Sequence, residues 1–337
     1  MKMNRNWLND LLGLPSLGEG GVATVRGREL VVTRGILRDS ALVETKQAQT
    51  RDAFAFKWAK TETYSSPEVE AATIEWERNR FGNLSDPAFW APYGAMPMVL
   101  DAGCGAGLTA RLLIGEGLRC IRYIGADIST AVDVAAEAFR RRGLPGYFIQ
   151  ADLLNLPFAE NSFDYILSEG VLHHTPSTRE AIHALARLLR KGGVLAFYVY
   201  KRKSPVREFT DDFIREQLQS MSPEEAWSAL MPLTKLGIAL GKLDVVVDVP
   251  EDVQLLGIPK GPINLQRLIY WHVCKMYYRP EYSFDEMNHV NFDWFTPAYS
   301  HRQSPEEVRK WCEEAGLDVR SMKIEEAGIT TEAVRTA

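Results

Sequence analysis

Cysteine is scarce in this chain of 337 residues, and its four occurrences are scattered. Cys104, Cys120, Cys274 and Cys312 form no C-x-x-C pair, which disfavours both a zinc ribbon and a disulfide framework. We therefore predict no metal site and expect a reducing compartment, the cytoplasm. The N-terminus lacks the basic-then-apolar pattern of a signal peptide, and no apolar run is long enough to span a membrane.

An excess of basic side chains is also missing. The sequence contains 39 lysines and arginines and 44 aspartates and glutamates, which gives a formal net charge of −5. This balance argues against a general nucleic-acid binder, so we expect no stable nucleic-acid partner. The length suits one large α/β domain with an elaboration, or two smaller domains. We expect a monomer or a homodimer.

Strands and helices alternate between residues 97 and 200, which predicts a parallel sheet with crossover helices. The expected strands cover residues 98–101, 123–127, 147–150, 163–168 and 194–200, and the expected helices cover 109–115, 131–142 and 179–189. Around this α/β core (97–200) we predict a small β-like module (1–45), a helical, aromatic-rich arm (46–96), a mainly helical insertion after the fifth strand (201–303), and a C-terminal helix with a β-hairpin (304–337) that completes the core.

One segment, Met-Val-Leu-Asp-Ala-Gly-Cys-Gly-Ala-Gly-Leu-Thr at 98–109, reads as a buried strand, a glycine turn and the start of a helix. Glycines let the backbone turn sharply and let a ligand approach without meeting a Cβ atom. The helix that follows points its N-terminal amides at that ligand. The turn is of the nucleotide-binding type, but its spacing, D-x-G-x-G-x-G, differs from the dinucleotide fingerprint G-x-G-x-x-G.

An acidic residue stands at or just after the end of each of the first three predicted strands. Asp101 can accept hydrogen bonds from loop amides and attract a cationic ligand group. Asp127 stands where a carboxylate can bind both ribose hydroxyls. Asp152 fits the exocyclic amine of an adenine, with Leu153 packed against the ring. The second acid alone also fits an NAD-dependent oxidoreductase, which Asp101 and the glycine spacing disfavour.

The fourth strand is followed by Glu169-Gly-Val-Leu-His-His-Thr, at the edge where open α/β sheets bind ligands. His174 is a candidate general base, because its unperturbed pKa lies near neutrality. Packing within the loop is an equally good interpretation of both histidines, and His173-His174 as a metal pair is disfavoured. Lys201-Arg202-Lys203 follows the fifth strand, either as a solvated surface or to recognise a carboxylate or phosphate on a substrate.

These motifs together, Asp-Ala-Gly-Cys-Gly-Ala-Gly, the acids at 127 and 152, and Gly-Val-Leu-His-His-Thr, resemble those of the class I S-adenosylmethionine (SAM)-dependent methyltransferases. The His-His variant is similar to the branch that methylates small molecules. The resemblance implies a Rossmann-like seven-stranded sheet of order 3-2-1-4-5-7-6 with the last-placed strand antiparallel. It also implies SAM as cofactor and S-adenosylhomocysteine as product. The methionine part would lie on Asp101, Gly103 and Gly105, the ribose on Asp127 and the adenine on Asp152.

We expect the cofactor to be bound by Asp101, Ala102, Gly103, Cys104, Gly105, Asp127, Ile128, Asp152, Leu153 and Glu169, with Trp58 and Tyr64 as part of a cover. The arm's aromatic residues could equally pack on the core. The expected substrate-binding residues are His173, Lys201, Arg202, Tyr270 and Trp294.

The function predicted is methyl transfer from SAM to a small-molecule acceptor through an oxygen, nitrogen or carbon nucleophile. The enzyme mainly holds the acceptor in line, which is worth about 7–11 kcal/mol. A base is needed only if the nucleophile carries a proton of high pKa, and the candidates are His174, His289, Asp293 and Tyr299. The alternatives are an RNA or protein methyltransferase and a SAM-binding protein without turnover.

Overall fold

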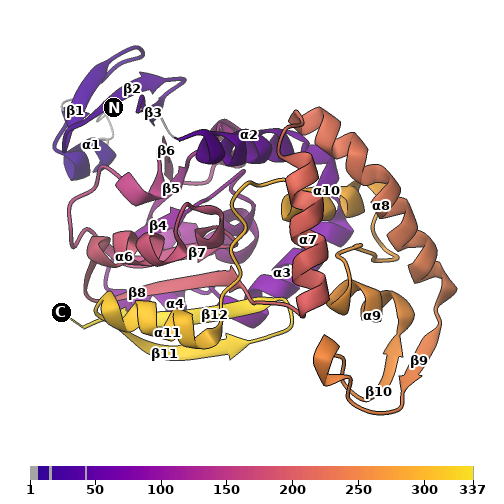
Figure 1. The fold of residues 1–337 in the computed structure, drawn as a ribbon. Coiled ribbons are helices and arrows are strands. Elements are labelled where there is room, and N and C mark those ends of the chain that lie inside the picture. The colour runs from indigo at the N-terminus through magenta and orange to yellow at the C-terminus, as the bar shows by residue number, and fades with distance from the viewer. Residues whose placement is uncertain (1–6, 15–16, 42–43, 337) are drawn as a thin grey trace.

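A ten-stranded sheet forms the centre of the molecule (Figure 1). The computed structural model describes residues 7–14, 17–41 and 44–336, so parts of the predicted module 1–45 lie outside the described residues. The strand order is β1-β2-β3-β6-β5-β4-β7-β8-β12-β11. The strands span Val22–Val25 (β1), Arg28–Thr33 (β2), Ile36–Asp39 (β3), Met98–Ala102 (β4), Arg122–Asp127 (β5), Tyr147–Gln150 (β6), Phe163–Glu169 (β7), Leu189–Tyr200 (β8), Leu317–Ile324 (β11) and Gly328–Arg335 (β12).

Within the sheet, the seven strands β6-β5-β4-β7-β8-β12-β11 have the predicted order 3-2-1-4-5-7-6. This order confirms the Rossmann-like α/β fold. Strands β4 to β8 are parallel, and β12 runs antiparallel to both of its neighbours. The structure adds three strands at one edge, because β3 pairs in parallel with β6. The N-terminal strands therefore extend the core sheet and cover the edge that β6 would otherwise expose.

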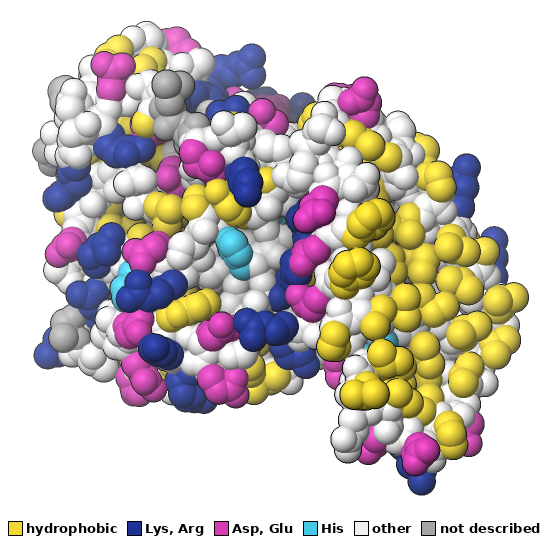
Figure 2. Space-filling model, viewed as in Figure 1, with side chains coloured by type: hydrophobic (Ala, Val, Ile, Leu, Met, Phe, Trp, Pro, Cys, Tyr) yellow, Lys and Arg dark blue, Asp and Glu magenta, His cyan; other side chains and the backbone are white. Residues whose placement is uncertain are grey.

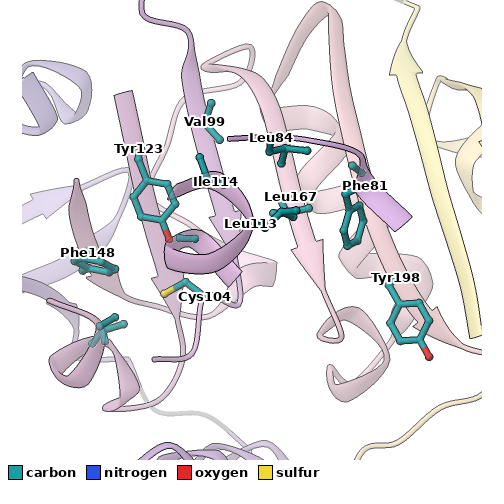
Figure 3. Close-up of a cluster of buried hydrophobic side chains, with 14 of the residues drawn as sticks. Phe81, Leu84, Val99, Cys104, Leu113, Ile114, Tyr123, Phe148, Leu167 and Tyr198 are labelled. Atoms are coloured by element: carbon teal, nitrogen blue, oxygen red, sulfur yellow. The ribbon is translucent and has the colours of Figure 1, made fainter. Parts of the chain in front are cut away.

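Alternate residues of the central strands pack on opposite faces of the sheet, as expected for strands buried on both sides. Val99 and Leu167 contribute to one core, drawn in Figure 3, whereas their neighbours Leu100 and Ile166 belong to the core on the other face. The second face is covered by α6 (Thr178–Leu188) and α11 (Pro305–Glu314), which contact each other. The first face is covered by α5 (Ala131–Arg142) and a π-helical turn at Ala110–Ile114.

The arm consists of α2 (Thr45–Ala59), α3 (Pro67–Phe81) and the short α4 (Pro87–Trp90). Helix α3 begins after Ser66, whose hydroxyl accepts a hydrogen bond of 3.2 Å from the amide of Val69. The N-terminal helix α1 spans Trp7–Leu12. In Figure 1, α2 and α3 of the arm lie between the sheet and the insertion, so they are placed beside the carboxyl ends of the strands.

The insertion contains α7 (Pro205–Leu218), α8 (Pro223–Leu243), β9 (Val246–Val249), β10 (Gly261–Asn264), α9 (Leu265–His272) and α10 (Phe284–Phe295). Strands β9 and β10 form a separate two-stranded sheet. Figure 2 shows hydrophobic side chains gathered on the outer face of this insertion, at the right of the view. Within the described ranges, no helix combines the length and the apolar character needed to cross a membrane.

Candidate active site

A cavity of about 420 Å³ lies at the carboxyl ends of the parallel strands, where the arm and the insertion close over the sheet. Three segments that are far apart in the sequence meet at its wall. Fourteen of the residues singled out from the sequence line it: Trp58, Tyr64, Gly103, Cys104, Asp127, Ile128, Asp152, Leu153, Glu169, His174, Tyr270, His289, Asp293 and Trp294. The cavity therefore joins the predicted cofactor residues to much of the predicted acceptor wall.

The glycine turn after β4 makes two close approaches that only glycine allows. Gly103 has a φ of +90°, and a Cβ atom there would lie 2.3 Å from the Val171 side chain. Gly105 has a φ of +50°, and a Cβ atom there would lie 2.7 Å from the indole of Trp58. The turn is thus held between the loop after β7 and helix α2, with Trp58 directly against it.

Asp127, the last residue of β5, is anchored to this turn. One of its carboxylate oxygens accepts a hydrogen bond of 2.9 Å from the Gly105 amide. The other accepts from the amide and the hydroxyl of Ser129, at 2.8 and 2.7 Å. Burial raises the pKa of this carboxyl, while these hydrogen bonds work in the opposite direction. Its position is therefore fixed before any ligand binds.

Asp101 lies beneath the turn and does not line the cavity. Its carboxylate is 2% exposed and accepts a hydrogen bond of 2.8 Å from the Tyr123 hydroxyl. Burial raises its pKa to about 7. Ala102 and Gly105 also lie behind the wall, and the Ala102 carbonyl accepts from the Ser168 hydroxyl at 2.8 Å. These residues shape the turn from below.

Asp152 caps the short helical turn that follows β6. Its two oxygens accept hydrogen bonds of 3.1 Å from the Leu154 amide and the Asn155 side chain. The carboxylate still lines the cavity beside Leu153. This local capping fixes the side chain at the strand end where the sequence predicts an adenine contact.

Two buried carboxyl groups, Glu77 and Glu169, share one region of the cavity wall. Burial and the charge of Glu169 raise the pKa of Glu77 well above its usual value. Burial likewise raises the pKa of Glu169 to about 7, opposed by the charge of Arg80. The Oε1 atom of Glu77 accepts from Thr109 at 2.6 Å, but Oε2 has no partner among the described residues. Both carboxyls are therefore held toward the neutral form in the ligand-free protein, and a cationic ligand would favour their ionisation.

Sequence analysis missed Glu77, although a signal was present. Val69, Thr73, Trp76 and Glu77 recur at helical spacing, and all four line the cavity from α3. That spacing places Glu77 on the same inward face of α3 as Val69, Thr73 and Trp76.

His174 presents one ring nitrogen to the site in a defined protonation state. Its Nδ1 atom lies 2.6 Å from the Tyr299 carbonyl oxygen. A carbonyl can only accept, so Nδ1 carries the proton and Nε2 keeps its lone pair. Nε2 is buried and has no partner among the described residues. Burial lowers the pKa of His174 to about 4, so the ring is neutral near pH 7.

His289 is held in the same way by Thr63. The Thr63 hydroxyl donates to the Lys60 carbonyl at 2.7 Å, and its oxygen lies 2.7 Å from Nδ1 of His289. Because the hydroxyl hydrogen is already used, Nδ1 must be the donor and Nε2 the free acceptor. Burial lowers the pKa of His289 to about 3.

Asp293 forms a buried ion pair with Lys57 of α2, at 2.5 Å between Nζ and Oδ1. The Tyr200 hydroxyl donates to the other oxygen at 3.2 Å. Burial alone would raise the pKa of Asp293, but the positive charges of Lys57 and Lys275 hold it well below its usual range. Asp293 is therefore an ionised partner of Lys57, a residue that sequence analysis did not single out.

Besides Asp101, Ala102 and Gly105, four further predicted residues do not line the cavity. Tyr299 donates its hydroxyl to Glu44 at the surface, and it is its carbonyl that contacts the site through His174. Arg202 pairs with Glu307 at 3.0 Å, and Lys201 lies 3.9 Å from Glu326. His173 is fully buried with its ring against Tyr200, 3.7 Å between centroids. Packing and surface ion pairs account for all four.

The residues present fit SAM, which carries a sulfonium and an ammonium. Carboxylates from consecutive strand ends line the cavity, Gly103 lines it without a Cβ atom, and Glu77 has an unsatisfied buried oxygen. Across residues 7–14, 17–41 and 44–336, no group of three His, Cys, Asp or Glu side chains is arranged to hold a metal ion.

The strand order and the glycine turn define an α/β domain of the class I methyltransferase type. Residues 100–197 match a family model described as a methyltransferase domain. The chain therefore contains a class I SAM-dependent methyltransferase domain.

Two relatives illustrate the extent of the match. A phthiotriol/phenolphthiotriol dimycocerosates methyltransferase of Mycobacterium leprae is 32% identical over 38% of this chain and 46% of that protein. A malonyl-[acyl-carrier protein] O-methyltransferase of Enterobacter lignolyticus is 36% identical over 29% of this chain and 37% of that protein. The chain thus spans less than half the length of either relative.

Among solved structures, the PH0226 protein of Pyrococcus horikoshii covers 81% of this chain and 96% of its own, at 16% identity and a TM-score of 0.42.

Proposed function

We propose that this chain transfers the methyl group of SAM to a small-molecule acceptor. The observation that carries the proposal is the single cavity that connects the strand-end carboxylates of the core to the aromatic and basic wall of the insertion. Cofactor and acceptor would therefore occupy one enclosed space. The cytoplasmic location and a monomeric or homodimeric state stay predictions.

On the cofactor side, the glycine turn would hold the methionine part, with Asp101 supporting it from beneath. Asp127 would take the ribose hydroxyls, and Asp152 with Leu153 the adenine. Glu77 and Glu169 have raised pKa values, so they would ionise fully only beside a cationic ligand, and their carboxylates would then stabilise its charge. When bound, SAM supplies a methyl carbon activated by its sulfonium.

On the acceptor side, His174 and His289 each keep an unprotonated Nε2 in the cavity. Either can take a proton from an acceptor hydroxyl or amine, as general bases do. Asp293 is a weaker base than either histidine, because the charges of Lys57 and Lys275 hold its pKa well below its usual range. We therefore propose that Asp293 neutralises the charge of Lys57. The Tyr299 carbonyl orients the ring of His174.

The walls that the arm and the insertion add around the strand ends favour a small acceptor over RNA or protein. Arm residues such as Trp58 and insertion residues such as Tyr270 line the same space as the strand ends. A macromolecule would need a wider approach to the methyl group. The names of the two relatives above describe methyltransferases of phthiotriol/phenolphthiotriol dimycocerosates and of malonyl-[acyl-carrier protein], which supports the proposal without naming the acceptor.

The test uses SAM labelled on its methyl group, incubated with the protein and a cell extract separated into metabolite, lipid, RNA and protein fractions. Label in the metabolite or lipid fraction is the expected result. Label confined to RNA or protein would overturn the small-molecule assignment. Bound SAM without transfer to any fraction would favour a binding protein without turnover.

A further inference from the structure

The cavity has opposite charges at its two ends. Glu77, Asp127, Asp152 and Glu169 gather where the strands end, whereas Lys203, Arg207 and Lys275 line the wall built by the fifth strand's end and the insertion. The carboxylate end suits the cationic cofactor of the proposed function. The basic end lies where that function places the acceptor. A positive charge there that lacks a protein partner therefore indicates which group the acceptor carries.

Most cations at the basic end already have partners. Arg207 pairs with Asp211 and also donates to the Tyr270 carbonyl. Lys57 pairs with Asp293. The Lys203 ammonium donates to two backbone carbonyls, those of Glu326 and Ala327, which leaves one of its three hydrogens.

Lys275 differs from all of these. Its side chain lies in the loop after α9 and is only 6% exposed, yet its ammonium forms no hydrogen bond or ion pair with any described residue. Its backbone amide donates to Asp211 at 3.2 Å, which fixes the start of the side chain. The Asp293 and Asp211 carboxylates act on this ammonium through space, but neither is hydrogen-bonded to it, so an anionic ligand in direct contact would be favoured.

The surroundings of Lys275 also define what accompanies the anion. Its Nζ atom lies 4.6 Å from the centre of the Trp294 ring, and Arg207 and Lys203 lie 5.2 and 6.0 Å from the same ring. The Trp294 indole is fixed, because its Nε1 donates to Asp211 at 2.8 Å. Tyr270 adds a second aromatic surface to the wall. The anion would therefore sit beside flat apolar surfaces.

We propose that the acceptor carries a carboxylate that binds the Lys275 ammonium, with a planar apolar body against Trp294. This inference rests on the proposed function for the identity of the ligand as methyl acceptor. A monoanion is favoured over a phosphate dianion, because Lys275 is the one wholly unpaired cation at the described basic end and Lys203 offers a single remaining hydrogen. Burial lowers the pKa of Lys275 to about 7, and a bound carboxylate would raise it again.

Calorimetry with benzoate, its neutral analogue benzamide, and phenyl phosphate tests this proposal on the full chain saturated with S-adenosylhomocysteine. We expect benzoate to bind at least tenfold more tightly than benzamide, and more tightly than phenyl phosphate. Lys275→Met should remove the preference for benzoate over benzamide. Lys310→Met, which removes a lysine on α11 outside the cavity, should retain it.

An equal affinity for benzoate and benzamide in the wild-type chain would overturn the proposal, as would a preference that survives in Lys275→Met. If phenyl phosphate binds more tightly than benzoate, the acceptor carries a phosphate and the proposed carboxylate is wrong. Lys275→Met should fold, because it removes an unpaired buried charge, and its unfolding midpoint checks this. SAM titrated into the ligand-free chain separates the two claims: absent SAM binding there would reject the proposed function, while the benzoate preference can still be measured in the ligand-free chain.

Discussion

The imidazole of His174 and the carbonyl of Tyr299 lie 2.6 Å apart although 125 residues separate them in the chain. This hydrogen bond joins the loop after β7 to the segment that returns from the insertion. It fixes the proton on Nδ1 and leaves the Nε2 lone pair free. A backbone carbonyl thus sets the tautomer of the side chain that is best placed to act as a base.

His174→Ala should lower kcat by about 10²–10⁴-fold for an acceptor whose hydroxyl must lose a proton, because general-base catalysis is worth about that much. Since the pKa of His174 is lowered to about 4, the wild-type rate should stay level from pH 8 to pH 5 and fall only as the pH approaches 4. Stopped-time assays of labelled methyl transfer across this range provide the measurement.

His183→Gln is the matched control, because His183 lies on α6 within 3.8 Å of Glu314 and outside the cavity wall. Its rate and pH profile should match the wild type. An acidic limb centred near pH 6.5 would contradict the neutral-base role of His174, and so would an unchanged rate in His174→Ala.

Asp127→Asn should weaken SAM binding by about 10–150-fold, the loss expected when charge-assisted hydrogen bonds worth about 1.5–3 kcal/mol are removed. The asparagine oxygen can still accept from the Gly105 amide, which holds the turn, whereas its NH2 group can no longer accept from Ser129. Calorimetric titration of SAM measures the change. Asp133→Asn, which alters an acid paired with Arg38 away from the cavity, should bind SAM normally. Unchanged affinity in Asp127→Asn would reject the ribose assignment, and tighter binding of NADH than of SAM would favour an oxidoreductase.

Gly103→Ala should destabilise the fold by about 1–3 kcal/mol through backbone strain alone. The new Cβ atom, 2.3 Å from Val171, would add a similar overpacking cost. Gly143→Ala separates the two effects, because Gly143 has a φ of +61° but nothing within 4 Å of the new Cβ atom. The free energy of unfolding in urea should fall markedly more for Gly103→Ala. Equal losses would show that the contact with Val171 is easily relieved.

The core could be predicted from the sequence because its signals are local. The first three parallel strands each end at or next to an acid, and helix α5 occupies the predicted residues 131–142. Parallel strands bring their carboxyl ends to one edge, so Asp127 and Asp152 reach the same cavity by topology alone.

The insertion side of the site could not be read in the same way. Lys57 and Asp293 form an ion pair across 236 residues, and only the packing of α2 against α10 brings them together. Lys201 and Lys203 are two residues apart, yet only Lys203 lines the cavity. A basic cluster in sequence therefore indicates the right region but not which ammonium faces inward.

Asp101→Asn should make the ligand-free protein more stable at alkaline pH. In the folded chain burial raises the pKa of Asp101 to about 7, whereas the unfolded chain has the ordinary value near 3.8. Below both values the carboxyl is neutral in both states, and its ionisation costs the fold nothing. As the pH rises from about 4 to 7 the unfolded chain loses its proton first, so the free energy of unfolding falls by up to about 1.4 kcal/mol for each unit of pKa difference.

An asparagine cannot ionise, and its side-chain oxygen can still accept the hydrogen bond from the Tyr123 hydroxyl. The variant should therefore match the wild type near pH 4 and exceed its free energy of unfolding increasingly up to about pH 7, with a constant difference above that. Urea unfolding at a series of pH values measures this. Asp164→Asn alters an acid paired with Arg190 at a partly exposed position and should show no such gain at high pH. If Asp101→Asn is less stable than the wild type at pH 8, then the carboxylate is stabilised by charge in the folded state, and the burial argument for Asp101 is wrong.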